Sequence, residues 1–219
     1  RYTYRLLFAP GTIGSITWLA KNQEKVRRIR HGLVLSCVGD AGGPMYKRSR
    51  RGNAAIDRVV ERVLAELAPT ADIQDFSPYG YDERQYCSPG FNLPVGLLER
   101  SKYGEFPEYH TSADNLDFIS AKELDFSYTI VAQVIETLET DWFPVNRLPH
   151  CEPQLGHRGL YKAMGGDNQS VERQMAMLWI LNLADGEHSL HDIAKRSGIA
   201  LSRVRKVAEV LLQHDLLTR

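Results

Sequence analysis

Apolar and polar positions alternate along the first 140 residues with two different periods. Longer stretches with apolar residues every three or four positions predict helices at residues 12–22, 53–67 and 120–140. Short runs rich in aromatic, β-branched and aliphatic side chains predict strands at residues 2–8, 32–38, 72–76 and 93–98. Strands that alternate with helices are typical of an α/β layered domain, so we expect a mostly parallel or mixed central sheet.

Polar residues mark where the predicted helices begin. Thr12 and Asn53 each precede a helical stretch and are residue types that accept hydrogen bonds from the first backbone N–H groups of a helix. Ser120 and Glu123 have the spacing of a capping box, in which both side chains accept such bonds. These positions set the expected starts of the three helices.

The last fifty residues follow a different pattern. The apolar pair Leu216–Leu217 is expected to begin a β-wing, and it follows three predicted helices at residues 171–184, 189–197 and 202–214. This order predicts a small winged helix-turn-helix domain.

A segment with no period separates the two patterns. Residues 144–169 are rich in proline and glycine, which is typical of a linker. We therefore predict an α/β domain at residues 1–143, a linker at 144–169 and a winged-helix domain at 170–219.

The chain is organised around a polar segment at residues 79–118, in which only one short apolar run predicts a strand. A long polar loop inside a well-patterned chain is more often functional than not, so we expect the site here. Its titratable side chains stand among Gly, Pro, Ser and Asn, and they are Asp82, Glu83, Arg84, Cys87, Glu105, Glu108, His110, Asp114 and Asp117.

His110 is the most informative of these residues, because a carboxylate, Asp114, follows it four positions later and a helix is predicted next. Three interpretations remain open from the residues alone: a metal ligand, a general base, or a structural histidine hydrogen-bonded to Asp114.

A basic run at residues 46–52 follows the glycine-rich loop after the second long strand. It is either a solvated surface or a site at which Arg48, Arg50 and Arg51 grip a carboxylate or phosphate. Asp82 and Glu83 are either substrate contacts or ordinary turn residues. The predicted substrate contacts are Tyr46, Lys47, Arg48, Arg50, Arg51, Asp82, Glu83 and Arg84.

Composition gives no strong preference for a partner. The 27 Lys and Arg residues balance 27 Asp and Glu residues, so nucleic acid and membrane surfaces are not favoured. The charge is unevenly spread, with 11 basic and 2 acidic residues in 1–51 but 6 basic and 17 acidic residues in 52–141. We interpret this asymmetry as compensation within one fold.

Cysteine usage and hydropathy indicate a cytoplasmic protein. Cys37, Cys87 and Cys151 are odd in number and lack C-x-x-C spacing, which argues against a disulfide framework. No apolar run approaches the roughly 18 residues that span a bilayer. The chain opens mid-pattern without Met, so we expect it to be a piece of something longer.

Three strings carry a resemblance to known proteins: CSPGFNLPVG, EYHTSADNLDF and EPQLGHRGLY. Residues 82–90 and 109–115 are similar to the C-terminal half of a zinc aminopeptidase domain, with its aspartate-led loop and Tyr-His-Thr-x-x-Asp motif. More narrowly, the whole chain resembles bacterial aminopeptidase-like proteins with a C-terminal winged helix, often linked by name to polysaccharide biosynthesis. The resemblance implies a three-layer aminopeptidase-like fold, one or two zinc ions, and hydrolysis of a small peptide or amide substrate.

The resemblance also implies roles for individual residues. His110 matches the histidine that binds metal in that superfamily, and Asp40 falls near its strand-end metal ligand, with Cys37 as the alternative alignment. Glu108 or Asp114 would orient the second nitrogen of the imidazole.

This chain departs from the superfamily pattern at the first strand. The catalytic glutamate usually follows that strand, where this chain has Ala9-Pro10-Gly11-Thr12, so no catalytic residue is assigned. The remaining ligands, a histidine and a bridging aspartate, would precede Arg1. We expect a fragment whose zinc site is incomplete.

Three functional hypotheses follow. The leading one is a zinc-dependent aminopeptidase-like hydrolase; the others are a ligand-sensing or DNA-binding regulator and a metal-free scaffold. Residues 171–219 carry 7 basic and 6 acidic side chains, whereas nucleic-acid readers are usually strongly basic. We therefore expect the winged helix to serve packing or dimerisation, the latter giving a homo-oligomer. We do not expect DNA or a membrane as a partner.

Overall fold

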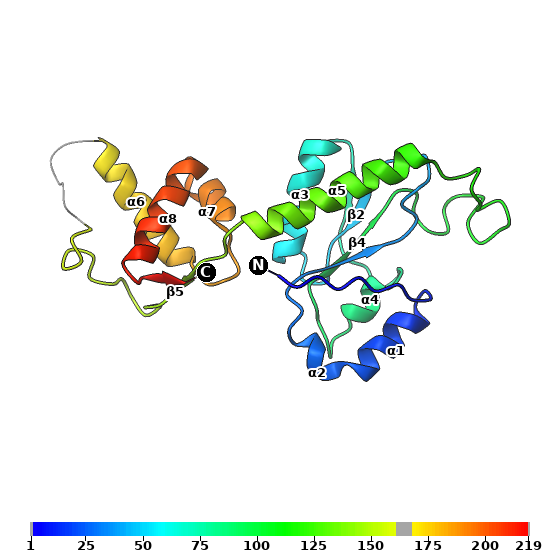
Figure 1. Cartoon of the computed structure of the whole chain (residues 1–219), viewed down its shortest axis with the longest axis horizontal. Helices are drawn as coiled ribbons and strands as arrows, with labels where there is room; N and C mark the ends of the chain where they lie inside the picture. The colour runs from blue at the N-terminus through cyan, green and yellow to red at the C-terminus, as the bar shows by residue number, and fades with distance from the viewer. Residues whose placement is uncertain (1, 161–167, 219) are drawn as a thin grey trace. The chain divides into compact units, whose positions relative to one another are not determined.

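The chain forms two compact units, residues 1–139 and residues 140–219. The computed structural model describes residues 2–160 and 168–218, and Figure 1 labels their elements. The predicted linker at 144–169 falls within the second unit. Its residues 161–167 lie outside the described residues.

A four-stranded mixed sheet forms the centre of the first unit. Its strand order is β1-β4-β2-β3; β4 runs parallel to β1 and antiparallel to β2, and β3 runs parallel to β2. The mixed α/β architecture predicted from the sequence is confirmed. The strands are β1 (Gly32–Leu35), β2 (Met45–Lys47), β3 (Asp72–Gln74) and β4 (Val95–Glu99).

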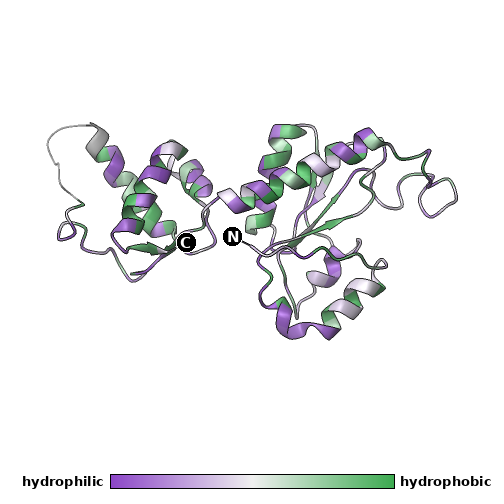
Figure 2. Cartoon of the chain, viewed as in Figure 1, coloured by the Kyte–Doolittle hydropathy of each residue, from purple (hydrophilic) through white to green (hydrophobic). Residues whose placement is uncertain are grey.

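Helices pack on both faces of this sheet, because side chains alternate along each strand. Leu98 of β4 joins a core with apolar side chains of α3 and α5, while Val95 joins a second core with Leu19 and Val26. Figure 2 shows hydrophobic residues along the strands and polar residues over the outer turns of the helices. The helices are α1 (Ile13–Lys21), α2 (Gln23–Val26), α3 (Ala55–Leu67), α4 (Glu83–Tyr86) and α5 (Ala121–Thr140).

The start of α3 depends on one buried carboxylate. Asp57 accepts hydrogen bonds from the Ala54 N–H (2.8 Å), the Tyr46 hydroxyl (2.7 Å) and the Ser49 hydroxyl (2.6 Å). A Cβ on Gly96 would lie 2.2 Å from the Tyr46 hydroxyl, so glycine is needed where that ring crosses β4. The prediction that Asn53 caps this helix is wrong, since Ala54 is the N-cap and Asp57 accepts its N–H.

Residues 2–8 do not form the predicted strand. Among the described residues no strand pairs with them, and Leu6 and Phe8 are exposed. An apolar run alone does not make a strand, because ladder hydrogen bonds from a neighbour are required.

Two other predicted helix starts are modified by tertiary contacts. Thr12 has a left-handed backbone (φ 63°) and makes no side-chain cap; its N–H donates to the Asp82 carboxylate at 2.5 Å. Ser120 accepts the Glu123 N–H at 3.2 Å, which confirms half of the predicted capping box. The Glu123 carboxylate instead pairs with Arg100.

The second unit contains the predicted three helices and a two-stranded wing. Ser189 and Asp192 form a capping box at the start of α7, and Gly198 ends that helix in the left-handed region (φ 71°). The wing pairs β5 with β6 antiparallel. The elements are β5 (Val145–Asn146), α6 (Asn168–Leu183), α7 (Leu190–Ser197), α8 (Leu201–Gln213) and β6 (Leu217–Thr218).

Across residues 2–160 and 168–218, none of the helices combines the length and apolar character that crossing a bilayer requires.

Candidate functional site

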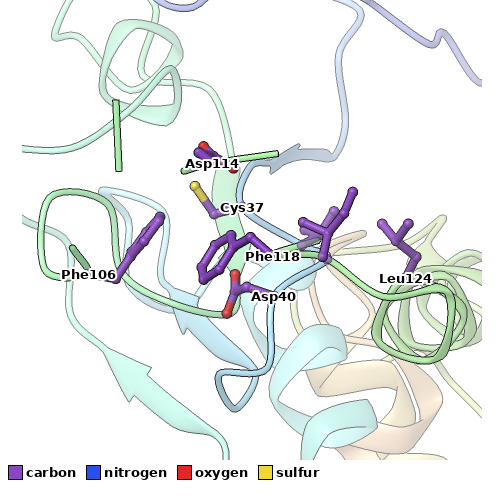
Figure 3. A pocket seen from close by; sticks show the side chains of 9 residues that line it. Cys37, Asp40, Phe106, Asp114, Phe118 and Leu124 are labelled. Atoms are coloured by element: carbon purple, nitrogen blue, oxygen red, sulfur yellow. The ribbon is translucent and has the colours of Figure 1, made fainter. Parts of the chain in front are cut away.

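Two cavities lie against the polar segment in the first unit. The first, here called the aspartate cavity, has a volume of about 210 Å³ and is formed where the chain leaves β1. The Phe106 and Phe118 rings stack in its wall with centroids 5.4 Å apart. Figure 3 shows its labelled side chains gathered around the space: Cys37, Asp40, Phe106, Asp114, Phe118 and Leu124.

Asp40 is buried and firmly held in this cavity. Its Oδ1 accepts hydrogen bonds from the Gly42 N–H at 2.8 Å and the Ser101 hydroxyl at 2.5 Å. Its Oδ2 has only a long contact, 3.4 Å, with the Ser101 N–H. The carboxylate is therefore oriented through one oxygen, while the other retains capacity for a further ligand.

Cys37 lines the aspartate cavity together with Asp40. Its backbone is left-handed (φ 48°), which is uncommon for a residue with a side chain. Burial raises the pKa of its thiol, and the charges of Glu99, Asp40 and Asp114 raise it further, so it stays a neutral thiol at neutral pH. Cys37 and Asp40 line the same cavity, so the alternative alignment with Cys37 as the metal ligand stays a prediction.

The second cavity, here called the tyrosine cavity, has a volume of about 410 Å³. A carbonyl in its wall, that of Tyr79, accepts hydrogen bonds from the Tyr103 hydroxyl (3.1 Å) and Lys47 Nζ (2.9 Å). Its principal side chains are Tyr79, Tyr81, Arg84, Tyr103, Tyr109 and His110.

Phenols in this wall stay protonated at neutral pH. Burial raises the pKa of Tyr109, and the Cys37 thiol adds to the shift. Burial and the charge of Asp82 raise the pKa of Tyr81, while burial and the charge of Glu83 raise that of Tyr103 to about 12. The cavity therefore presents neutral rings and hydroxyl donors.

His110 lies at the surface of the tyrosine cavity. Its backbone is left-handed (φ 58°), and its ring stacks on Tyr109 with centroids 4.0 Å apart. Neither ring nitrogen has a hydrogen-bond partner among the residues that the structure describes. The imidazole is therefore available to a metal ion or a substrate.

The predicted partners of His110 lie elsewhere. Asp114 lines the aspartate cavity with Asp40, and Glu108 bonds to Thr111 through its backbone carbonyl. No hydrogen bond joins either carboxylate to His110 within residues 2–160. Their role in orienting the imidazole stays a prediction.

A buried ion cluster lies next to the wall of the tyrosine cavity. Lys47 forms an ion pair with Glu83, and their side chains are only 4% and 0% exposed. Glu99 is also completely buried, and a Cβ on Gly80 would collide with both Glu83 and Lys47. These two carboxylates and one ammonium fix the position of the loop that carries Tyr79.

Of the predicted substrate contacts, Arg84 lines one of the two cavities and the others are engaged in structural interactions. Arg48 pairs with Glu61 (2.6 Å) and Asp75 (2.7 Å). Arg50 and Arg51 both donate to Asn92, at 3.1 and 2.8 Å.

The remaining predicted contacts are packed into the fold. Tyr46 bonds to Asp57, and Lys47 bonds to Glu83. Asp82 accepts hydrogen bonds from Thr12 and from the Ser15 hydroxyl (3.1 Å). The side chains of residues 46–51 thus mostly form hydrogen bonds and ion pairs within the first unit.

The two predicted metal ligands line different cavities, Asp40 the first and His110 the second. No group of three or more His, Cys, Asp or Glu side chains suited to a metal ion occurs in residues 2–160 or 168–218. Asp40 and His110 provide donor types that zinc accepts, but a catalytic zinc takes three protein ligands.

Sequence reasoning missed the residues that shape the site. Ser101 orients Asp40, and Tyr79, Tyr81, Tyr103 and Tyr109 line the tyrosine cavity. The density of tyrosines between residues 79 and 109 was the available signal for the second cavity.

Comparison with known families decides the membership of the first unit. A family model described as Domain of unknown function (DUF4910) matches residues 1–141, more than half of the chain. The chain belongs to the DUF4910 family. A second model, described as winged helix-turn-helix, matches residues 142–219 and agrees with the fold of the second unit.

Two relatives of this DUF4910 chain come from Clostridium acetobutylicum. One, whose name proposes a polysaccharide biosynthesis protein with an aminopeptidase-like domain, is 49% identical over 217 residues, which is 99% of this chain and 50% of the relative. The other is a crystal structure described as a proposed peptidase; it has 47% identity and a TM-score of 0.66, over 96% of this chain and 47% of that one. The chain thus spans about half the length of the relatives it matches.

Proposed function

We propose that this chain contributes to a zinc-dependent, aminopeptidase-like hydrolase of peptide or amide bonds, built on a three-layer aminopeptidase-like domain. The names of the two relatives support a peptidase-like role. The observation that carries the metal dependence is a buried carboxylate with one little-used oxygen, Asp40, and an unpartnered imidazole, His110, in neighbouring cavities.

These two residues fit zinc in donor type. A carboxylate oxygen and an imidazole nitrogen are common zinc ligands, and Ser101 holds the Asp40 carboxylate in one orientation. When bound, zinc lowers the pKa of its water and polarises the substrate carbonyl. Two ligands are fewer than a catalytic zinc takes, so further ligands have to come from other residues, and we expect the chain alone to hold zinc weakly.

The chain's own residues have separate tasks in this proposal. Asp40 and His110 would hold the metal, while the Tyr81 and Tyr103 hydroxyls line the space in which a substrate would lie. Arg84 lies in the same cavity and would bind an anionic group. Catalysis also needs a group that accepts a proton from water, and we assign none.

Removing the His110 imidazole is expected to weaken zinc binding. His110→Ala should raise the zinc dissociation constant by at least about tenfold, because even an outer partner of a metal ligand contributes 10- to 100-fold. Asp40→Asn should have a similar effect while keeping an oxygen acceptor for Ser101. Equilibrium dialysis followed by elemental analysis measures both.

His150→Ala is the matched control, since His150 is an exposed histidine in the other unit. It should leave the zinc dissociation constant within about twofold of the parent chain, a change too small to reflect a lost ligand. If His110→Ala behaves like His150→Ala, the ligand assignment is wrong.

A further inference from the structure

The tyrosine cavity contains one charged group that the fold leaves without a partner. Arg84 lines the cavity from α4, and its Nε is buried with no hydrogen-bond acceptor. No ion pair or hydrogen bond joins its guanidinium to another residue in 2–160 or 168–218. A buried donor without an acceptor costs free energy. The two Nη atoms of Arg84 are not among the buried groups and also have no acceptor among the described residues, so they are the atoms that a ligand in the cavity can reach.

Two nearby arginines differ from Arg84 in having partners, although Arg100 Nη1 is also buried without an acceptor. Arg48 has Glu61 and Asp75 as partners, and Arg100 donates to the Asp40 carbonyl at 2.6 Å and pairs with Glu123. The fold therefore neutralises comparable guanidinium groups internally. Arg84 differs because its surroundings include a cavity of about 410 Å³, within the usual range for a small-molecule site.

The charge around Arg84 selects the type of anion. Among the residues that the structure describes, no carboxylate lines the tyrosine cavity, and the guanidinium is the one permanent charge in its wall. Asp82 lies next to the cavity wall, where it accepts the Thr12 N–H, whereas the charge of Glu83 is offset by its ion pair with Lys47. That negative field opposes a dianion such as phosphate more than a monovalent carboxylate.

The phenol rings define the rest of the ligand. Tyr79 and Tyr103 have ring centroids 5.7 Å apart, and Tyr109 stacks on His110. Such faces pack against another planar ring. The Tyr103 O–H already donates to the Tyr79 carbonyl, so the Tyr103 oxygen can only accept from a ligand. A ligand that fits these walls has a ring close to its carboxylate.

We propose that Arg84 forms a carboxylate subsite in the tyrosine cavity, and that the ligand is a ring-bearing amino-acid derivative with one carboxylate. The statement that this ligand is the substrate rests on the proposed function, because His110 lines the same cavity. The carboxylate then belongs either to an acidic side chain or to a free C-terminus. Both sources share the same chemistry at the guanidinium.

Calorimetric titration of the chain in the presence of EDTA tests the subsite without metal. N-acetyl-L-tyrosine is compared with N-acetyl-L-tyrosinamide, and L-glutamyl-p-nitroanilide with L-glutaminyl-p-nitroanilide, so each pair differs only in the carboxylate. We expect one acid to bind at least about tenfold more tightly than its amide, since charge-assisted hydrogen bonds to a guanidinium are strong. A preference in the tyrosine pair identifies a free C-terminus as the source of the carboxylate, and a preference in the glutamyl pair identifies an acidic side chain.

Arg84→Gln should abolish the preference for the acid, and Arg84→Lys should reduce it, because lysine lacks the fork that contacts both oxygens. Arg27→Gln is the matched control; Arg27 is exposed on the surface, 3.8 Å from Glu24, and should retain the preference. Circular dichroism confirms that each variant is folded. If Arg84→Gln does not fold, the comparison of acid with amide on the parent chain still shows whether the cavity prefers a carboxylate.

Equal binding of acid and amide in both pairs would overturn the subsite, and so would a preference that survives in Arg84→Gln. Inorganic phosphate competing better than acetate would overturn the choice of a carboxylate. A preference seen in EDTA without zinc-dependent hydrolysis would leave the subsite standing and remove the proposed function. Zinc-dependent hydrolysis without a preference for the acid would leave the proposed function standing and remove the subsite.

Discussion

Replacing Lys47 with methionine is expected to lower the free energy of unfolding of the first unit by about 3–5 kcal/mol. Lys47 is the ammonium of the buried cluster, and its loss leaves two completely buried carboxylates, Glu83 and Glu99, without the buried cation that pairs with Glu83. Methionine preserves most of the volume, so the change isolates the charge. Hydrogen exchange of the β2 and β4 amides measures the effect in this unit separately from the other.

Lys122→Met is the control for this substitution. Lys122 is 89% exposed and lies 3.5 Å from Glu123, so its loss should change stability by no more than about 0.5 kcal/mol. Adding Glu83→Gln to Lys47→Met should recover part of the lost stability. A loss below about 1 kcal/mol for Lys47→Met would show that the cluster does not stabilise the fold through its ion pair.

Glu99 is expected to make the first unit less stable as the pH rises toward neutrality. Burial, and then the charge of Glu83, raise the pKa of Glu99 from 4.5 to about 7, although Lys47 acts in the opposite direction. Between these values the folded protein keeps a proton that the unfolded chain releases. The stability that Glu99 contributes is therefore fully present below about pH 4.5 and is lost as the pH rises through about 7. The loss in the free energy of unfolding is roughly 3 kcal/mol.

Glu99→Gln should remove this part of the pH dependence. We expect the difference in free energy of unfolding between Glu99→Gln and the parent to change by roughly 3 kcal/mol in favour of the variant from pH 4.5 to pH 8. Hydrogen exchange of the β4 amides, corrected for its intrinsic pH dependence, gives the profile. Glu105→Gln, at a side chain that is 62% exposed, is the control, and parallel profiles for Glu99→Gln and the parent would contradict the assignment.

The elements with a strong period could be predicted, and those that depend on a neighbour could not. The apolar spacing located α3, α5 and the three helices of the second unit to within a few residues. Residues 2–8 have the composition of a strand but no pairing partner among the described residues. Composition reports the preference of a segment, whereas a strand is a property of two segments.

The candidate site was predictable in part. The resemblance pointed to His110 and Asp40, and the polar segment pointed to Arg84. The cluster of Lys47, Glu83 and Glu99 joins β2, α4 and β4, and no sequence spacing reveals such a meeting. For the same reason the basic run of residues 46–51 suggested a ligand clamp, although its side chains mostly bond to acceptors distant in the sequence.

The most direct test of the proposed hydrolase is aminopeptidase activity of the complete gene product before and after removal of metal. Hydrolysis of amino-acid p-nitroanilides should be lost after treatment with a chelator and should return when zinc is added, in the parent and in His150→Ala. In His110→Ala the added zinc should restore little activity. Hydrolysis that persists without metal, or that zinc restores equally in His110→Ala, would contradict a zinc-dependent site that includes His110.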